Sequence, residues 1–312
     1  MKLITSLSDE LPYKSCVATI GFFDGVHVGH RYLVERLKNY AQAHGMASLL
    51  ITFRTHPRVV MQSDYQPRLL STYDEKVELL SKTGVDALVS LDFTPEMASM
   101  TARQFMDEVL RGRLSVKSLV IGYDHRFGRN RAETFEDYVR YGKELGIAVV
   151  RADAFQKNDL SVSSSMVRSC LTEGEVKIAA QCLGRYYALT GLVEKGFQVG
   201  SELGYPTANI SINDVCKLIP KDGVYAVKMT IGNAAKKWCG MLNIGKRPTL
   251  DNGDNKTIEV HVLDYQGDLY GQEVTLEFVS RLRDEKKFRN KSELVNQLRM
   301  DEAMVRKIFK NL

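Results

Sequence analysis

The stretch Thr19–Arg31, which reads TIGFFDGVHVGHR, most constrains what this chain can fold into. The apolar run Cys16–Ile20 leads into it and predicts a short buried strand, and apolar residues at helical spacing follow His30. A strand, a glycine-rich turn and a helix start bring unpaired backbone N–H groups and a positive dipole end against an anion. The imidazoles of His27 and His30 can donate hydrogen bonds to the same phosphate group there.

Two other interpretations of these residues are less specific. Glycines are common in strand-to-helix turns, and a His-x-x-His pair can bind a metal, although the HExxH pattern is absent and no cysteine lies nearby on the helix side. The full string Gly21–His30 resembles the HxGH signature of the nucleotidylyl transferase superfamily. In particular, it is similar to the GxFDGxHxGH form found in bacterial bifunctional riboflavin kinase/FAD synthetases. The resemblance implies ATP-binding and catalytic roles for six residues: Gly21, Phe22, Asp24 and Gly29 for ATP, His27 and His30 for catalysis.

Length and composition indicate an ordinary globular protein of two domains or one large one. The 312 residues are 44% hydrophobic and 26% charged, which suffices for sizeable cores. The net charge of +5 suits acidic small molecules such as nucleotides, and the dense Lys/Arg blocks of a nucleic-acid binder are absent. Five cysteines without a CxxC pair favour a reduced, cytoplasmic compartment. No signal peptide and no membrane span are expected, and the oligomeric state is left open.

Residues 1 to about 160, within a first predicted domain of residues 1–183, alternate short apolar runs with helical patterns. Strands are predicted at Cys16–Ile20, Ala47–Phe53, Val85–Leu91, Leu119–Gly122 and Ile147–Val150. Helices are predicted from His30 to near Gly45, from the Thr72–Glu75 capping box to Gly84, from the Thr101–Gln104 cap to near Gly112, and over Phe135–Leu145. Repeated strand–helix units indicate an α/β, Rossmann-like fold with a parallel, doubly wound sheet. Ligands bind such sheets at the carboxyl ends of the strands, where the string Gly21–His30 lies.

Two further loops follow predicted strands. Each of them, Phe53–Pro57 (FRTHP) and Gly122–Gly128 (GYDHRFG), would read as a surface loop if it stood alone. Together they resemble the TFxPHP and GxDFxFG segments of the FAD synthetase family, which implies that the flavin is bound by His56, Pro57, Asp124 and Phe127. The chain departs from that pattern at Arg54, which adds a charge, and at His125, which replaces a phenylalanine.

A run of serines precedes an apolar helical segment at Ser163–Arg168 (SSSMVR). Such a run is usually a helix N-cap. It also resembles the SS(T/S)xxR segment of the family, whose arginine faces the ATP phosphates from the side opposite HxGH. The resemblance implies that Ser163, Ser164 and Ser165 bind ATP and that Arg168 is catalytic.

The pattern changes after the predicted helix Val176–Leu183, so we place a domain boundary between residues 183 and 184. Period-two strands separated by turn residues such as Asn252–Asp254 are predicted at Val224–Ile231, Trp238–Ile244, Thr257–Asp264 and Glu273–Ser280. They indicate an antiparallel β-barrel over 184–312, since closure removes exposed edges. The basic amphipathic helix from Ser292 onward is expected to cover the barrel; a membrane or partner helix is the alternative.

The stretch Leu203–Asn209 (LGYPTAN) would read in isolation as a Gly-Pro turn before a strand. It resembles the PTAN signature of riboflavin kinases, which implies that Thr207 and Asn209 bind the Mg²⁺ of MgATP and that Gly204 contacts ATP. Hard oxygen ligands suit Mg²⁺. The preceding segment 196–200 (GFQVG) could fold over phosphates, and Ser201 stands where the family often has an arginine.

Two more stretches of the second half contain candidate functional residues. Gly240–Arg247 matches three of the four fixed P-loop positions, but Arg247 stands where Ser or Thr must bind Mg²⁺, so we reject a P-loop. The run resembles instead the NIGxRPT segment of the kinase family. Alternation along Thr257–Asp264 puts Glu259, His261 and Leu263 on one face. An outward-facing carboxylate is the ordinary interpretation of Glu259, and its position matches the glutamate base of the riboflavin kinase family.

The two motif sets occur in the order of the bifunctional riboflavin kinase/FAD synthetase family, which implies two reactions. The C-terminal barrel would phosphorylate riboflavin to FMN with MgATP, and the N-terminal domain would join FMN to the AMP part of ATP to give FAD and pyrophosphate. ATP is a co-substrate of both, and no nucleic acid or membrane is involved. The alternatives are a single-activity adenylyltransferase acting on another phosphorylated substrate, and a non-catalytic regulator that binds flavin or nucleotide.

Overall fold

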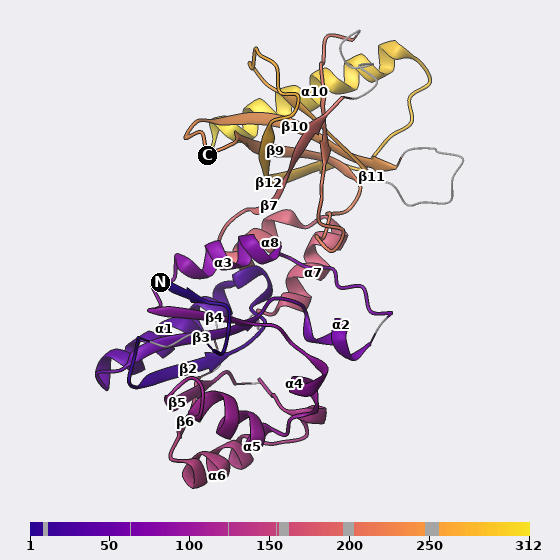
Figure 1. The fold of residues 1–312 in the computed structure, drawn as a ribbon. Coiled ribbons are helices and arrows are strands. Elements are labelled where there is room, and N and C mark those ends of the chain that lie inside the picture. The colour runs from indigo at the N-terminus through magenta and orange to yellow at the C-terminus, as the bar shows by residue number, and fades with distance from the viewer. Residues whose placement is uncertain are drawn as a thin grey trace. The chain divides into compact units, whose positions relative to one another are not determined.

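The computed structural model describes residues 1–8, 12–62, 64–123, 125–153, 155, 162–195, 203–246 and 256–312. It divides the chain into two compact units, Met1–Ser164 and Ser165–Leu312, which are described separately (Figure 1). Several predicted features lie outside the described residues: Asp124, Ser201, the segment 196–200, the end of the NIGxRPT segment at 247–249 and the turn Asn252–Asp254.

A parallel sheet forms the centre of the first unit, as predicted. Its strands, in the order β1-β4-β3-β2-β5-β6, are β1 (Lys2–Ile4), β4 (Ala87–Leu91), β3 (Ala47–Phe53), β2 (Cys16–Ile20), β5 (Val116–Ile121) and β6 (Ala148–Arg151). The five predicted strands are present, with ends shifted by up to three residues, and β1 was not predicted. The chain runs from β2 through β3 to β4 on one side and places β5 on the other side of β2. A crevice for ligands is expected where the strand order reverses, at the carboxyl ends of β2 and β5.

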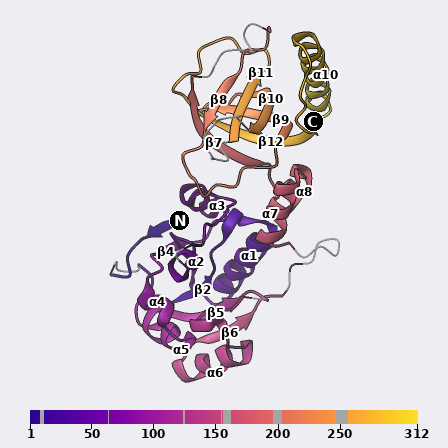
Figure 2. The same ribbon diagram turned by 90° about the vertical axis from the view of Figure 1, so that its right-hand side faces the viewer.

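Helices cover both faces of this sheet (Figure 2). They are α1 (Val28–Ala43), α2 (Pro57–Met61), α3 (Tyr73–Ser81), α4 (Pro95–Ser99), α5 (Ala102–Gln104) with the π-helical η2 (Phe105–Arg111), and α6 (Phe135–Leu145), besides the single turns η1 (Asp24–Val26) and η3 (Arg129–Arg131). One face packs on Val34 and Leu37 of α1 and Leu80 of α3, the other on Phe105 of η2 and Tyr138 of α6. The doubly wound prediction is therefore confirmed, although the helix predicted from Thr101 changes to a π-helix at Phe105.

A closed barrel forms the second unit, in the strand order β10-β11-β8-β7-β12-β9. Its strands are β7 (Tyr187–Glu194), β8 (Ala208–Ser211), β9 (Gly223–Ile231), β10 (Lys237–Lys246), β11 (Lys256–Val262) and β12 (Glu273–Arg283). Every described pairing in the barrel is antiparallel. The predicted barrel is confirmed, and the four predicted strands correspond to β9, β10, β11 and β12, whereas β7 and β8 were not among the predicted strands.

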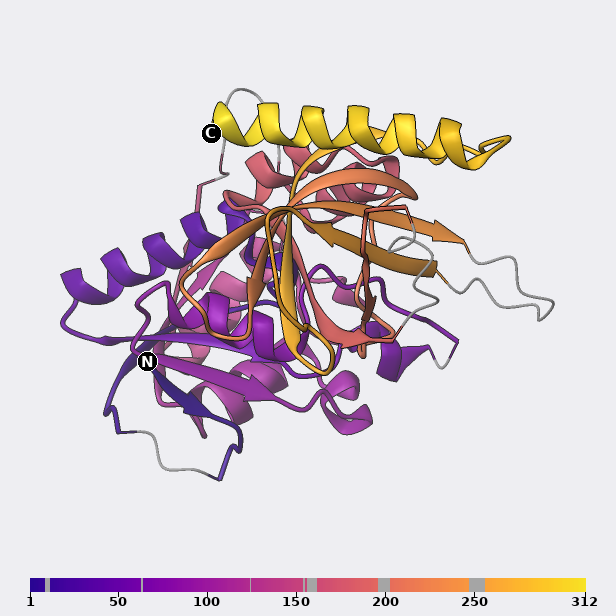
Figure 3. The ribbon, with the colours of Figure 1, turned by 90° about the horizontal axis from the view of Figure 1, so that it is seen from above.

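The C-terminal helix α10 (Lys291–Lys310) lies across the outside of the barrel strands (Figure 3). Its Val305 is buried against Ala226 of β9 and Met241 of β10. A bidentate ion pair also joins the helix to β12, because Arg283 donates to both carboxylate oxygens of Asp301 at 2.7–3.1 Å. The predicted cover is therefore present. Among the helices of the described residues, none is long and apolar enough to cross a membrane.

The helices α7 (Ser164–Glu173) and α8 (Val176–Leu183) pack on the barrel. Helix α8 contacts β7 and β12, and the backbone N–H of Lys221 donates to the Leu171 carbonyl at 3.0 Å. Gly174, between the two helices, lies so close to Arg281 that an added Cβ would be 2.6 Å from its Cδ. The second compact unit thus begins at Ser165, whereas the sequence pattern changes at Gly184.

We expect a fragment spanning 165–312 to be more stable than one spanning 184–312. Removal of α8 deletes apolar side chains, among them Val176 and Leu183, that are buried in the whole chain. The burial of each stabilises the fold by about 1.5–3 kcal/mol. A loss of this size lowers the melting temperature by roughly 5–10 °C in a domain of this length. Thermal unfolding followed by circular dichroism measures the difference, and equal melting temperatures would show that α7 and α8 do not stabilise the barrel.

Candidate functional site

The turn after β2 is shaped by a buried carboxylate. Asp24, which is 3% exposed, accepts hydrogen bonds from the backbone N–H groups of Leu70 at 2.9 Å and Ser71 at 3.2 Å. The Ser71 hydroxyl in turn accepts from the N–H of Gly25, whose φ of +75° favours glycine. The Asp24 carboxylate fixes the conformation of the turn through these hydrogen bonds, and its predicted role in binding ATP stays a prediction.

The two histidines of the HxGH string lie at the start of α1. This helix begins at Val28, two residues before the predicted start, and His27 is its N-cap, whose Nδ1 accepts from the His30 N–H at 3.3 Å. The two rings stack with centroids 3.6 Å apart. A Cβ at position 29 would lie 3.2 Å from the His27 ring, so Gly29 leaves room for that ring. Both imidazoles therefore sit at the positive end of a helix dipole, where an anion is favoured.

The environment of His30 keeps its imidazole neutral at pH 7. Burial lowers the pKa of His30 well below 6.5, and the neighbouring His27 and His125 lower this pKa further. His125 is the residue that replaces the family's phenylalanine, and the structure brings it to the histidine pair. Among the described residues, the buried Nδ1 of His30 has no hydrogen-bond partner. A buried polar atom without a partner is uncommon, and a bound ligand is one explanation.

The serine run reaches the same turn. The Ser164 hydroxyl donates to the Asp24 carbonyl at 3.0 Å, across 140 residues of sequence, and the Val162 carbonyl lies 3.5 Å from where a Cβ of Gly29 would be. Ser163 precedes α7, and Ser165 and Arg168 lie on that helix within the second unit. The predicted approach of Arg168 to the histidines stays a prediction.

The residues predicted to bind flavin divide into two groups. His56 is the N-cap of α2, followed by Pro57, and its ring meets the ring of Phe22 edge-on with centroids 4.6 Å apart. This loop therefore lies beside the HxGH turn. Phe127, by contrast, is 9% exposed and stacks on Tyr138 in the core, with centroids 4.5 Å apart. Its side chain supports the loop after β5 and offers little surface to a ligand.

A row of polar residues crosses three neighbouring barrel strands. Glu259 of β11 is paired with Asn209 of β8 on one side and with Asn243 of β10 on the other. All three are half-buried, whereas the flanking residues, such as Ala208 and Val260, are buried in the barrel. The predicted alternation of β11 is therefore present. Register alone brings a carboxylate and two amides to one face.

The stretch before Asn209 is attached to this face from two sides. The Tyr205 hydroxyl contacts a carboxylate oxygen of Glu302 on α10 at 3.1 Å, and the His261 ring N–H donates to the Pro206 carbonyl at 2.8 Å. Thr207 follows, half-buried, and Gly204 is exposed with a φ of +80°. The strand register places Asn209 beside Glu259, and the metal roles of Thr207 and Asn209 and the base role of Glu259 stay predictions.

Sequence reasoning did not identify two residues near these sites. Glu285 accepts a hydrogen bond from the Asn243 amide at 3.4 Å, and no sequence signal marked it. Lys76 of α3 is buried against the turn after β2. Its spacing of four residues from the core residue Leu80 was the available signal, because residues four apart share one helix face.

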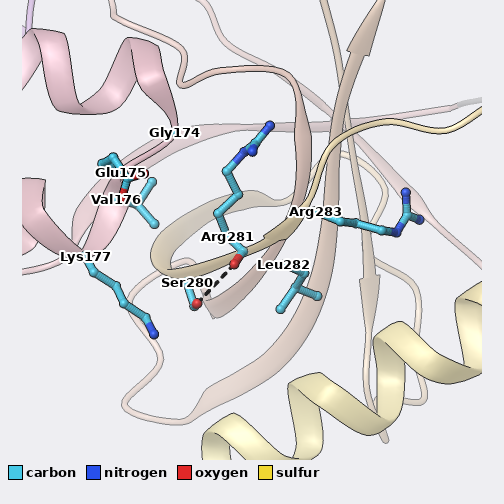
Figure 4. A pocket seen from close by; sticks show the side chains of 8 residues that line it. All are labelled: Gly174, Glu175, Val176, Lys177, Ser280, Arg281, Leu282 and Arg283. Carbon is cyan, nitrogen blue, oxygen red and sulfur yellow. Dashed lines mark hydrogen bonds between the residues drawn. The ribbon is translucent and has the colours of Figure 1, made fainter.

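A hollow of about 260 Å³ lies within the second unit, between the α7–α8 connection and the end of β12. Figure 4 shows Arg281, Arg283 and Lys177 pointing in different directions from it. Arg281 donates to the Asp222 carbonyl and to Asp284, and Arg283 is paired with Asp301. These cations do not converge on one point, so we assign no ligand to this hollow.

Both halves of the chain match known families. Residues 10–166 match the FAD synthetase model and residues 183–309 the riboflavin kinase model. The bifunctional riboflavin kinase/FMN adenylyltransferase of Escherichia coli (strain K12) is 34% identical over 311 residues, which cover 99% of this chain and 98% of that protein. The protein of the same description from Pseudomonas fluorescens is 34% identical over 307 residues, covering 98% and 97%.

A solved structure shares the whole fold. It comes from Streptococcus pneumoniae, is described as a macrolide-efflux protein, and matches with a TM-score of 0.89 at 30% identity, covering 98% of this chain and 99% of that one. A shared fold transfers no activity by itself, and the efflux description applies to that protein.

The fold and sites define a class of protein in which a nucleotidylyl transferase-type α/β unit precedes a riboflavin kinase-type barrel. Within that class, the chain belongs to the bifunctional riboflavin kinase/FMN adenylyltransferase family.

The lowered pKa of His30 predicts sensitivity to acid. The unfolded chain binds a proton at His30 near pH 6.5, whereas the folded chain binds it only at lower pH. The free energy of unfolding therefore falls as the pH drops below 6.5, by at most about 1.4 kcal/mol per pH unit for one proton. Urea unfolding at pH 7.0 and 5.5 should show a smaller loss for His30→Gln than for the wild type.

The matched control for this measurement is His44→Gln. His44 is exposed at the other end of α1, so this variant should lose as much stability as the wild type between the two pH values. If His30→Gln also loses as much as the wild type, the acid sensitivity does not come from His30.

Proposed function

We propose that the chain makes FAD from riboflavin in two steps, phosphorylating riboflavin to FMN at the barrel and adenylylating FMN at the α/β unit. The observation that carries the proposal is the register that sets Glu259 beside Asn209, next to the anchored PTAN stretch. Full-length similarity to relatives described as riboflavin kinase/FMN adenylyltransferases supports both steps. Riboflavin, FMN and ATP are the small-molecule substrates, and no nucleic acid or membrane takes part.

In the kinase reaction, Glu259 acts as general base. Its carboxylate takes the proton of the riboflavin 5′-hydroxyl while that oxygen attacks the γ-phosphorus of ATP. The bond from the γ-phosphorus to the bridging oxygen breaks, and ADP leaves. Asn209 and Asn243 on either side of Glu259 keep its carboxylate in a polar, half-buried setting open to a substrate hydroxyl.

A magnesium ion would be held by the hydroxyl of Thr207 and the amide oxygen of Asn209. The donor set fits, because both are neutral oxygen ligands that leave the remaining positions to phosphate oxygens and water. When bound, the ion would neutralise negative charge on the phosphates. The contacts of Tyr205 and Pro206 hold these two residues against the barrel.

In the adenylyl reaction, a phosphate oxygen of FMN attacks the α-phosphorus of ATP. The bond from that phosphorus to the α–β bridging oxygen breaks, and pyrophosphate leaves without a covalent enzyme intermediate. His27, His30 and Arg168 stabilise the charge of the in-line transition state by hydrogen bonding, which is electrostatic work. Ser164 holds the serine run against the turn through the Asp24 carbonyl.

A cytoplasmic location accompanies this function. All five cysteines lie among the described residues and all are free thiols, which is consistent with a reducing compartment.

Incubation of the purified chain with riboflavin, ATP and Mg²⁺, with products separated by chromatography, tests the proposal. We expect FMN to form first and FAD to follow, with pyrophosphate released alongside FAD. FAD from supplied FMN without any FMN from riboflavin would indicate a single-activity adenylyltransferase. Binding of riboflavin and ATP without turnover would indicate a regulator.

Glu259→Gln should abolish most of the kinase step alone. Loss of a general base typically costs about 10²–10⁴ in rate, so FMN formation from riboflavin should fall by that factor, while supplied FMN is still converted to FAD. The control is Glu273→Gln, which changes an exposed glutamate at the start of β12. Normal FMN formation by Glu259→Gln would contradict the assignment of the base.

The reverse is expected of His30→Ala and Arg168→Ala. Each removes a donor to the transferring phosphate, which typically costs about 10²–10³ in rate, so FMN should accumulate and release of pyrophosphate should fall. His44→Ala, at the far end of α1, serves as control. FAD formation at the wild-type rate by both variants would show that the HxGH turn is not the adenylyl site.

A further inference from the structure

The side chain of Lys76 is almost completely buried. Its side chain on α3 is 2% exposed and ranks among the largest fully buried side chains of the described residues. A buried lysine is uncommon, because desolvation of an ammonium is costly unless other groups compensate for it. Lys76 lies on α3, whose start is fixed by the Thr72 capping box, so local structure defines the position of Lys76.

The ammonium joins the ends of two neighbouring strands. Its Nζ donates to the carbonyl of Phe53, the last residue of β3, at 2.7 Å, and lies 3.9 Å from the ring centroid of Phe22, which follows β2. Among the described residues, the Phe53 carbonyl is the one hydrogen-bond acceptor that it contacts. The Thr52 hydroxyl donates to the Phe22 carbonyl at 3.1 Å, which adds a second link between the same two strands.

Phe22 transmits this contact to the loop predicted to bind flavin. One side of its ring faces the Lys76 ammonium, and the ring also meets His56 at a centroid distance of 4.6 Å. The electron-rich face of an aromatic ring attracts a cation, and the attraction is stronger when the cation is desolvated. Phe22, between the HxGH turn and His56, therefore contacts both the Lys76 ammonium and the His56 ring.

Few other charged or titratable groups surround Lys76. Asp24 of η1 favours the charged form, the ring of Tyr73 on α3 lies 5.9 Å from Nζ, and His56 of α2 lies beyond Phe22. Arg54 stacks on Tyr73 from the outside and is paired with Asp92. Burial outweighs the attraction of Asp24 and lowers the pKa of Lys76 to about 8.

We propose that Lys76 is a positioning residue of the adenylyl site, whose ammonium holds Phe22 and the end of β3 together and so sets the spacing between the HxGH turn and the His56 loop. The inference rests on the proposed function, since that spacing is the one between the expected ATP and FMN subsites. Lys76 acts through Phe22 and the Phe53 carbonyl and touches neither substrate.

Activity and stability should then respond to pH in opposite directions. Deprotonation above pH 8 removes the attraction for Phe22, so kcat/KM for FAD formation should fall. The contribution of Lys76 to stability, measured as the difference between the wild type and Lys76→Met, should rise over the same range, because an unfolded lysine with an ordinary pKa near 10.4 binds more protons than the folded one. A lysine with a merely structural role would not lower activity while its own contribution to stability rises.

The experiment compares Lys76→Met, Lys76→Arg and Lys38→Met with the wild type, in the full chain, from pH 7 to 9.5. Lys38 is the matched control, because its Nζ also donates to a backbone carbonyl at 2.7 Å, that of Thr83, away from the HxGH turn. FAD formation from FMN and ATP is the readout, melting temperature reports folding, and FMN formation from riboflavin in the same samples is the internal reference.

We expect kcat/KM for FAD formation to fall about tenfold in Lys76→Met at pH 7. A 1 Å misplacement of reacting groups costs roughly a hundredfold in rate, and we expect the loss of the ammonium to cause a smaller displacement. The wild-type curve should converge on that of Lys76→Met by pH 9.5, Lys76→Arg should stay flat, and Lys38→Met should follow the wild type. If Lys76→Arg does not fold, the convergence of the wild type with Lys76→Met decides the matter.

Two outcomes would overturn the inference separately from the proposed function. An active wild type whose FAD formation does not change between pH 7 and 9.5, or a folded Lys76→Met with wild-type kcat/KM, contradicts the role of Lys76 alone. A wild type that makes FMN but no FAD at any pH contradicts the proposed adenylyl activity, and the inference falls with it.

Discussion

The buried carboxylate of Asp24 is the interaction on which the first site depends. A charge withdrawn from water must be compensated by hydrogen bonds, and here the donors are the backbone N–H groups of Leu70 and Ser71. The backbone carbonyl of Asp24 accepts a hydrogen bond from the Ser164 hydroxyl. Three segments far apart in sequence therefore meet at one turn. That turn leads directly to His27, the N-cap of α1. Changes at Asp24 would displace all of them together.

The barrel site depends on a different constraint, the register of its strands. A slip of one residue would turn Glu259 to the barrel interior and bring Ile258 or Val260 outward. Closure of the barrel and the cover by α10 oppose such a slip, since the helix is fixed by the Arg283–Asp301 pair and itself contacts Tyr205. Strand pairing thus positions the polar row of the second site, whereas the buried Asp24 carboxylate positions the residues of the first site.

Local features of the fold were predictable from sequence, and long-range ones were not. The helices α6 and α8 have the predicted bounds, and the two predicted capping boxes, at Thr72 and Thr101, both form. Capping and periodicity could be predicted because they depend on residues only a few positions apart. The three-residue β1 carries too little pattern to detect. The docking of α7 and α8 on the barrel, the burial of Phe127 and the contact of Ser164 with Asp24 depend on partners distant in sequence. The HxGH and PTAN strings were visible as motifs, whereas no motif marked Lys76.

Features that oppose stability gather around the turn after β2. Phe23 and Val26 have φ values of +56° and +39°, which are strained for side chains with a Cβ and especially for a β-branched one. His30 and Lys76 are held where burial lowers their pKa, so the folded state binds their protons less readily than the unfolded chain does. Selection for stability alone would remove such features, because apolar replacements at buried positions are often more stable. Their concentration at one strand end, beside the expected phosphate site, is explained if the turn is maintained for what it binds.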